Sequence, residues 1–226
     1  MRQARLDGFT LTELLIVVAI LTIIATLAIP NLLSARELAN ETAVVATMRT
    51  LSSSQTRVQA AVAIDVDRDG AGEYAYFGEL SGEFTLRGSS GVLIPPALAA
   101  AFGHIASGRV VRSGYNLQIY LPGPGGVGVP EDPDGGKAVA SEIDANLAET
   151  IWCIYAWPVS RGISGTRAFF VNQVGEILQC QNETAVYAGG LSVPTSDAAF
   201  RTPGTIAGPI AVDTIGQDGE RWTKVQ

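Results

Sequence analysis

The sequence is poor in the residues that build most catalytic and metal centres. Its 226 residues include one histidine, His104, and only two cysteines, Cys153 and Cys180. A zinc site of the usual kind needs several such ligands, so the sequence predicts none. It also contains no Ser/His/Asp or Cys/His arrangement, no paired carboxylates of known spacing and no cofactor-binding fingerprint. We therefore predict that the protein is not an enzyme.

Positive charge is also scarce. Fifteen Lys and Arg residues stand against 22 Asp and Glu residues, which gives a net charge of −7. Nucleic-acid binding requires clustered Lys and Arg to replace the counterions of the phosphates, so we expect no nucleic-acid partner. Hydrophobic residues make up 47% of the chain. Much of this hydrophobicity lies in one block near the N-terminus.

The apolar block follows a short basic segment. Residues 1–8 contain Arg2 and Arg5, and residues 9–30 are apolar with Glu13 as their single charged residue. A run of about 21 apolar residues can cross a bilayer as a helix. Because the basic residues precede it, we expect the N-terminus in the cytoplasm and the chain beyond the helix on the outer side of the membrane.

The interpretations of this segment differ in how they treat Glu13. A cleaved secretory signal carries no carboxylate at the head of its apolar region, and it needs small residues at a cleavage site where Leu33 stands instead. A plain membrane anchor leaves Glu13 unexplained, since an unpaired carboxylate in a membrane is costly. In a simpler alternative, Glu13 only extends to the membrane surface.

A further interpretation accounts for the order of the residues. The sequence of residues 8–21, GFTLTELLIVVAIL, resembles the processing motif of the type IV pilin and type II secretion pseudopilin superfamily. This resemblance implies that residues 1–8 are a leader, which a prepilin peptidase removes after Gly8. The same peptidase is expected to methylate the new N-terminal amine at Phe9.

The resemblance also assigns roles in assembly to Glu13 and Pro30. Glu13 is the fifth residue of the processed chain, and its carboxylate is expected to neutralise the amine of Phe9 in the same or a neighbouring subunit, so that each charge has a partner. Pro30 lies where the family tends to place a helix-kinking proline. A proline inside a helix removes a backbone hydrogen bond, so we expect a kink near Pro30.

Beyond Pro30 we expect the helix to continue as an amphipathic half over residues 31–63. Five apolar residues repeat at helical spacing and share one face, which would bury against the rest of the protein: Val44, Met48, Leu51, Val58 and Val62. Arg36 and Glu41 are interpreted as a solvated face of the helix or as contacts between subunits.

Residues 64–226 are predicted to form one globular, β-rich head. Residues 116–121 alternate between apolar and polar, which predicts a strand with one buried and one exposed face. Residues 149–159 and 167–180 predict further strands, with a hairpin turn at 172–175. Residues 91–107 predict a short helix. The expected fold is α+β and pilin-like: a long N-terminal helix, with its apolar half exposed, packed on an antiparallel sheet.

One segment of the head has the pattern of an ion site. Asp65, Asp67 and Asp69, followed by a glycine, resemble the first half of an EF-hand calcium loop. The twelfth position, which should be a glutamate, is Tyr76. Glu73 is therefore the candidate fourth ligand, with Glu79 as the alternative. The alternative is an acidic turn that ends the helix and begins the sheet.

The two cysteines lie in predicted neighbouring strands, beyond the membrane segment. An oxidising compartment favours a disulfide between Cys153 and Cys180, which would stabilise the head by roughly 3 to 4 kcal/mol. Two free buried thiols are the alternative.

Together these features predict a structural subunit of a type IV pilus-like filament, or fimbrium, and not a catalyst. The alternatives are a pseudopilin of a type II secretion system and, from another class, a monomeric membrane-anchored protein that binds a cation such as calcium. The resemblance implies four kinds of partner: the prepilin peptidase, copies of this chain and other pilins or pseudopilins, an inner-membrane assembly platform, and the lipid bilayer. We expect a single-pass protein of the bacterial inner membrane that enters a periplasmic or extracellular filament.

Overall fold

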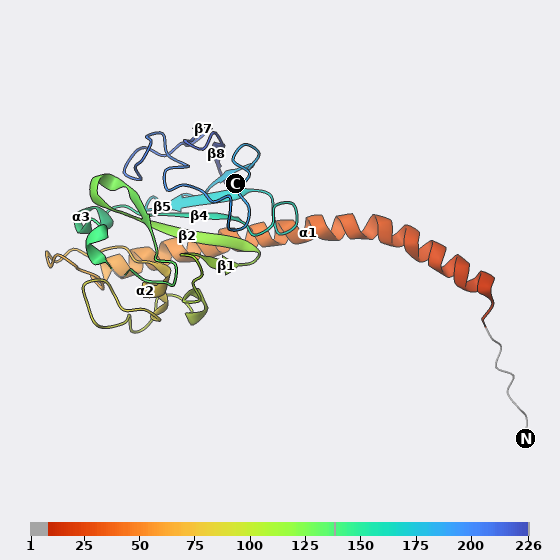
Figure 1. Ribbon diagram of the computed structural model, residues 1–226, viewed down its shortest axis with the longest axis horizontal. Helices are drawn as coiled ribbons and strands as arrows, with labels where there is room; N and C mark the ends of the chain where they lie inside the picture. Colours follow the sequence, from red (N-terminus) through yellow and green to blue (C-terminus); the bar gives the residue numbers. More distant parts are fainter. Residues whose placement is uncertain (1–8, 138, 226) are drawn as a thin grey trace, which may run out of the picture.

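A computed structural model describes residues 9–137 and 139–225. The predicted leader, residues 1–8 with Gly8, lies outside the described residues. One long helix, α1 (Leu11–Ala60), runs the length of the molecule. Its C-terminal part is embedded in the head, and its N-terminal part extends away from the head (Figure 1).

The helix α1 is continuous through Pro30. The chain therefore does not melt at the proline, and the exposed half of the helix curves gently (Figure 1). The helix ends three residues before the expected boundary at Ala63. Val62 adopts a left-handed conformation with φ of 49°, and the amides of Val62 and Ala63 donate to the carbonyls of Gln59 and Val58, which closes the last turn.

The head is built on one antiparallel sheet of eight strands. The strand order is β1-β2-β4-β5-β6-β8-β7, and β3 pairs with the same edge of β2 as β1 does. The strands have the following bounds: β1 Val110–Arg112, β2 Tyr115–Pro122, β3 Gly128–Pro130, β4 Cys153–Pro158, β5 Ala168–Asn172, β6 Leu178–Cys180, β7 Thr214–Ile215 and β8 Arg221–Lys224. This architecture confirms the predicted α+β, pilin-like fold.

Short helical segments connect the strands. The α-helices are α2 (Phe77–Ser81) and α3 (Ala145–Ala148), and the 3-10 turns are Ala100–Phe102, Pro124–Gly126 and Ala140–Glu142. The helix predicted within residues 91–107 is wrong, because that segment contains only the turn at Ala100–Phe102. The hairpin predicted at 172–175 is confirmed, since the amide of Gly175 donates to the carbonyl of Asn172 between β5 and β6.

The sheet is the middle layer of the head. One face packs on α1 and on residues 64–110, and the other is covered by the chain around Tyr187–Ala211 (Figure 1). Every residue of β2 is consequently buried. The prediction of one exposed face on this strand was wrong, because the C-terminal segment, which lacks the periodicity of a helix or strand, covers the face that carries Gln118 and Tyr120.

The buried face of α1 agrees with the predicted periodicity. Val44, Met48, Leu51 and Val58 are all buried in the first hydrophobic cluster. Val62 is not buried with them and remains 42% exposed, because it lies beyond the end of the helix.

The predicted disulfide is not formed. Cys153 and Cys180 are free thiols, and both are buried on the sheet face covered by the C-terminal segment. The strand register explains this. Cys153 pairs with Asn172 at one end of β5, whereas Cys180 pairs with Ala168 at the other end. Two strand spacings and four residues along a strand separate them by about 16 Å, far beyond disulfide geometry.

Candidate functional site

The first turn of α1 is organised by Thr10 and Glu13. The Glu13 carboxylate accepts hydrogen bonds from the Thr10 amide at 2.9 Å and from the Thr10 hydroxyl at 2.7 Å. The Glu13 amide donates to the Thr10 hydroxyl oxygen at 3.2 Å. This reciprocal arrangement is a capping box, which satisfies backbone donors that the start of a helix otherwise leaves unpaired. Glu13 thus has a local partner one residue away from Phe9.

The N-terminal half of α1 exposes its side chains on all sides. Residues 9–26 and 28–36 are exposed, among them the large apolar side chains of Leu14, Ile20 and Ile24. The hydroxyls of Thr22 and Thr26 donate to the carbonyls of Val18 and Ile23 in the preceding turn. The polar groups are therefore satisfied inside the helix, which is the requirement for a helix in lipid. Among the described residues, α1 is the one helix that is long and apolar enough to cross a membrane.

A polar network holds α1 to the head where the helix enters it. The Glu41 carboxylate accepts from Arg167 Nε at 2.8 Å, from the amides of Thr166 and Arg167 at 3.1 Å, and from the Tyr115 hydroxyl at 3.3 Å. Burial alone would raise the pKa of Glu41, but hydrogen bonds from Arg167 and Thr166 hold the pKa below its usual range. Glu41 is therefore not part of a solvated face.

No pattern in the sequence indicated this network. Glu41 and Arg167 lie 126 residues apart in the chain, and sequence spacing predicts only contacts within one helix or hairpin.

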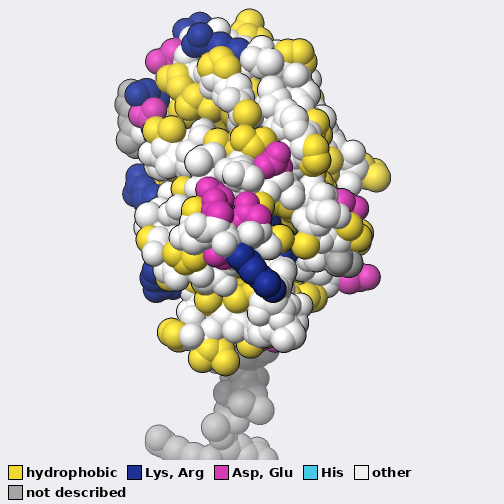
Figure 2. Space-filling model, turned by 90° about the vertical axis from the view of Figure 1, so that its left-hand side faces the viewer, with side chains coloured by type: hydrophobic (Ala, Val, Ile, Leu, Met, Phe, Trp, Pro, Cys, Tyr) yellow, Lys and Arg dark blue, Asp and Glu magenta, His cyan; other side chains and the backbone are white. Residues whose placement is uncertain are grey.

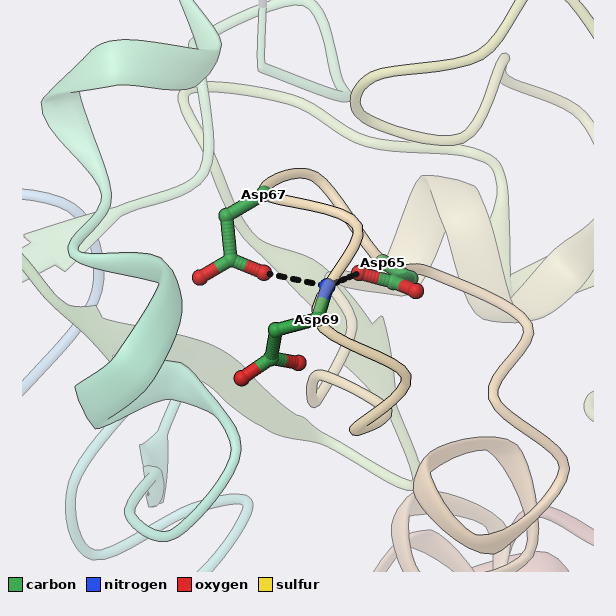
Figure 3. A group of neighbouring side chains, drawn as sticks. All are labelled: Asp65, Asp67 and Asp69. Carbon is green, nitrogen blue, oxygen red and sulfur yellow. Dashed lines mark hydrogen bonds between the residues drawn. The ribbon is translucent and has the colours of Figure 1, made fainter.

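The aspartate loop, residues 65–71, lies at the end of the head where α1 ends. Figure 2 shows acidic side chains gathered near the middle of this end. The ligand atoms of Asp65, Asp67 and Asp69 all lie within 4.8 Å of one another, and Figure 3 shows the three carboxylates grouped around the Asp69 amide. That amide donates to Asp65 Oδ1 at 3.2 Å and to Asp67 Oδ1 at 3.3 Å. The loop is thus closed by its own backbone, as an acidic turn would be.

Glu73, the predicted fourth ligand, is not a member of this group of carboxylates. Its side chain is buried, where Oε1 accepts from the Val66 amide at 2.8 Å and Oε2 forms an ion pair with Arg87 at 3.2 Å. Arg87 is itself buried and also pairs with Glu79 at 3.0 Å. A buried arginine attracts the carboxylates around it because an unpaired buried charge is costly. The structure therefore groups the three aspartates without Glu73.

The charges of the three aspartates act on a different carboxylate, that of Glu149. Partial burial raises the pKa of Glu149, and the negative charges of Asp69, Asp67 and Asp65 raise it further. Among the described residues, Glu149 Oε1 has no hydrogen-bond partner. Glu149 follows α3, nearly 80 residues after Asp69, so local spacing did not indicate it. Oxygen ligands of this kind suit a hard cation such as calcium, and calcium binding at the aspartate loop stays a prediction.

Comparison with known proteins shows what the N-terminal segment is similar to. Residues 7–29 match the prokaryotic N-terminal methylation motif. The chain is also 61% identical over 46 residues to the type IV wide pilus major component PilA4 of Thermus thermophilus. The N-terminal segment is that of a type IV pilin-like prepilin.

The similarity to PilA4 covers a limited part of either chain. It includes 20% of this chain and 34% of PilA4, so the chain spans about a third of the length of this relative. No solved structure matches the chain. The comparisons thus support the pilin-like segment that contains Phe9, Glu13 and most of the exposed half of α1.

Proposed function

We propose that this pilin-like prepilin is a structural subunit of a type IV pilus-like filament. A prepilin peptidase cuts the chain between Gly8 and Phe9, and the mature subunits assemble through α1. The observation that carries the proposal is the exposed half of α1, which presents apolar side chains on every side while the rest of the helix is fixed in the head. Such a surface needs either lipid or other helices around it, and a bundle of identical helices supplies the second environment.

The matching motif and the PilA4 similarity support the same function. PilA4 is described as the major component of a wide type IV pilus, and this chain is 61% identical to it over 46 residues. In this proposal the prepilin is first anchored in the bacterial inner membrane, with residues 1–8 in the cytoplasm and the head outside. It then enters the filament by exchanging lipid for neighbouring helices.

Glu13 has two roles that can be separated. In the structure its carboxylate caps the first turn through Thr10. In the assembled filament the same negative charge would neutralise the free amine of Phe9 in a neighbouring subunit, because a charge among apolar helices is costly without a partner. The capping role needs only a hydrogen-bond acceptor, whereas the neutralising role needs the charge.

The test begins with mass spectrometry of the protein purified from its native membranes. We expect a mature chain that starts at Phe9 with one added methyl group. A chain that keeps Met1 would contradict processing, and a chain that starts beyond Pro30 would indicate a secretory signal peptide instead.

Two variants of one residue then test assembly. Glu13→Gln keeps an oxygen that can accept from the Thr10 amide, whereas Glu13→Ala removes both the acceptor and the charge. We expect both variants to insert into the membrane. We also expect electron microscopy to show few filaments of either variant in the material sheared from the cells. Normal filaments from Glu13→Gln would show that capping suffices, and normal filaments from Glu13→Ala would refute the assembly role of Glu13.

A further inference from the structure

The head has an apolar groove at the end where α1 terminates, here called the distal groove. It has a volume of about 350 Å³ and is formed by the last turn of α1 with its exit, residues 57–63, and by the segment 93–97. Ile94 is 83% exposed at its rim. The Arg57 guanidinium and the Ser54 hydroxyl both donate to the carbonyl of Ala97, which fixes the segment against the helix. The groove is thus held in shape and remains open to a partner.

Negative charge lies directly beside the distal groove. Asp65 follows the groove residue Ala63 by two positions, and Asp67 and Asp69 are exposed. The exposed Arg68 lies in the same loop, so three negative charges and one positive charge leave residues 65–69 with a net charge of −2. Arg57 lines the groove, where its guanidinium is bound to the carbonyl of Ala97. In Figure 2, which views this end of the head, hydrophobic side chains lie close to the acidic group. An apolar groove bordered by carboxylates fits a partner with an apolar side chain next to a cation.

The opposite end of the head carries such a pair. The loop of residues 160–165 lies where α1 enters the head, and the Asn40 side-chain amide donates to the Ser164 carbonyl at 2.8 Å. On this loop Ile163 is 57% exposed, and Arg161 is exposed two positions before it. Within the described part of the chain Arg161 forms no ion pair. We call this loop the proximal knob.

The knob and the groove of one chain cannot meet each other. Residues 40 and 61 mark the two ends along α1, and at 1.5 Å per residue they are about 30 Å apart. Contact between the two surfaces therefore requires a second copy of the chain. Because the two surfaces differ, the contact is heterologous and repeats along a line, as a filament requires.

We infer that the proximal knob of one subunit docks in the distal groove of the next subunit, with Ile163 in the groove and Arg161 facing the aspartate loop. This inference rests on the proposed filament function, in which parallel α1 helices point all heads the same way. Parallel heads place the proximal end of one subunit over the distal end of another. The proximal end also carries the negative charges of Glu37 and Glu183. Arg161 is the charged residue nearest to Ile163 in the chain, so we assign the contact with the aspartate loop to Arg161.

Paired cysteine substitutions in the full-length chain test this contact. In cells that assemble the filament, Ile163→Cys and Ile94→Cys are combined in one chain, and sheared filaments are treated with a short bifunctional maleimide. We expect a ladder of covalent oligomers on a denaturing gel. The native thiols Cys153 and Cys180 are buried and should not react.

The matched control combines Ile163→Cys with Ile215→Cys. Ile215 is 64% exposed, like Ile163, but β7 and the chain near Glu183 place it toward the proximal end. An end-to-end contact cannot join two proximal residues, so this pair should give no ladder. Either single variant alone should also remain uncross-linked.

The outcomes separate this contact from the filament function itself. Filaments with a ladder from the 163/94 pair alone would support the docking. Three results would overturn the docking and leave the filament function intact. The filaments could lack that ladder, the control pair could give an equal ladder, or a single variant could give dimers. If the unsubstituted chain formed no filaments, the proposed function would fail, and the docking with it.

Discussion

The Glu41 network should make a large contribution to the stability of the head. In Glu41→Gln the amide oxygen can still accept from the backbone of Thr166 and Arg167, but the charge that pairs with the Arg167 guanidinium is lost. Removing one partner of a buried ion pair costs about 3 to 5 kcal/mol. The Arg167 side chain is 30% exposed and can regain water, so we expect a loss of about 2 kcal/mol in the free energy of unfolding.

Denaturant unfolding of the full chain in detergent would measure this loss. All three tryptophans, Trp152, Trp157 and Trp222, are buried in the head, so their fluorescence reports the head alone. The matched control is Glu37→Gln, since Glu37 accepts one long hydrogen bond, from the Thr166 hydroxyl at 3.4 Å. The control should stay within about 0.5 kcal/mol of the native chain.

The same pair of chains gives a pH test with a definite sign. The pKa of Glu41 lies below its ordinary value of 4.5 in the folded head. Its stabilising contribution is therefore fully present above pH 4.5 and is lost as the pH falls through the folded pKa. The difference between the native chain and Glu41→Gln should be constant near neutrality and should shrink below about pH 4.5. Equal stability at pH 7, or a difference independent of pH, would refute this account of the network.

Three further predictions concern the core of the head. Burial raises the pKa of Glu131 to about 7. The neutral form of Glu131 therefore stabilises the fold by roughly 3 kcal/mol below pH 4.5, and this contribution is lost as the pH rises through 7. Glu131→Gln should remove this part of the pH dependence of unfolding, and a pH curve parallel to that of the native chain would contradict the prediction. Met48→Ala should cost about 2 to 5 kcal/mol in the same assay, whereas the exposed Thr50→Ala should cost little. Cys153 and Cys180 should be alkylated only after denaturation, and a reducing agent should leave the unfolding midpoint unchanged; mass spectrometry showing a bridge would overturn the strand register described here.

The sequence predicted the parts of the fold that depend on local patterns. A long apolar run and a 3.6-residue repeat identify α1 and its buried face, because both patterns lie within one continuous segment. The alternation of β2 predicted a strand correctly but predicted its burial wrongly. That burial depends on residues 187–211, which pack over the sheet without regular secondary structure and so leave no periodicity to detect.

The candidate site shows the same division between local and long-range information. Asp65, Asp67 and Asp69 are grouped as their alternate spacing predicted, because a single turn brings them together. Glu73 is absent from the group because its carboxylate pairs with the buried guanidinium of Arg87. The charges of the group act on Glu149, which follows α3, and α3 contacts the loop through Asn146, whose side-chain amide donates to Asp67. The spacing of residues in the sequence predicts neither the position of Glu73 nor that of Glu149.

The two halves of α1 also divide the work of a filament subunit in a way that follows from their contacts. The half within the head is fixed by polar bonds as well as by apolar packing: the Gln55 side chain accepts from the Ala75 amide at 2.9 Å and donates to its carbonyl at 2.7 Å, in addition to the bonds of Glu41. Releasing this half would leave buried polar groups unpaired, which is costly. In the exposed half, the hydroxyls of Thr22 and Thr26 donate to carbonyls of the same helix. In the proposed filament, an exchange of lipid for neighbouring helices along the exposed half would leave the packing of the head unchanged, so the proposed assembly requires no unfolding of the subunit.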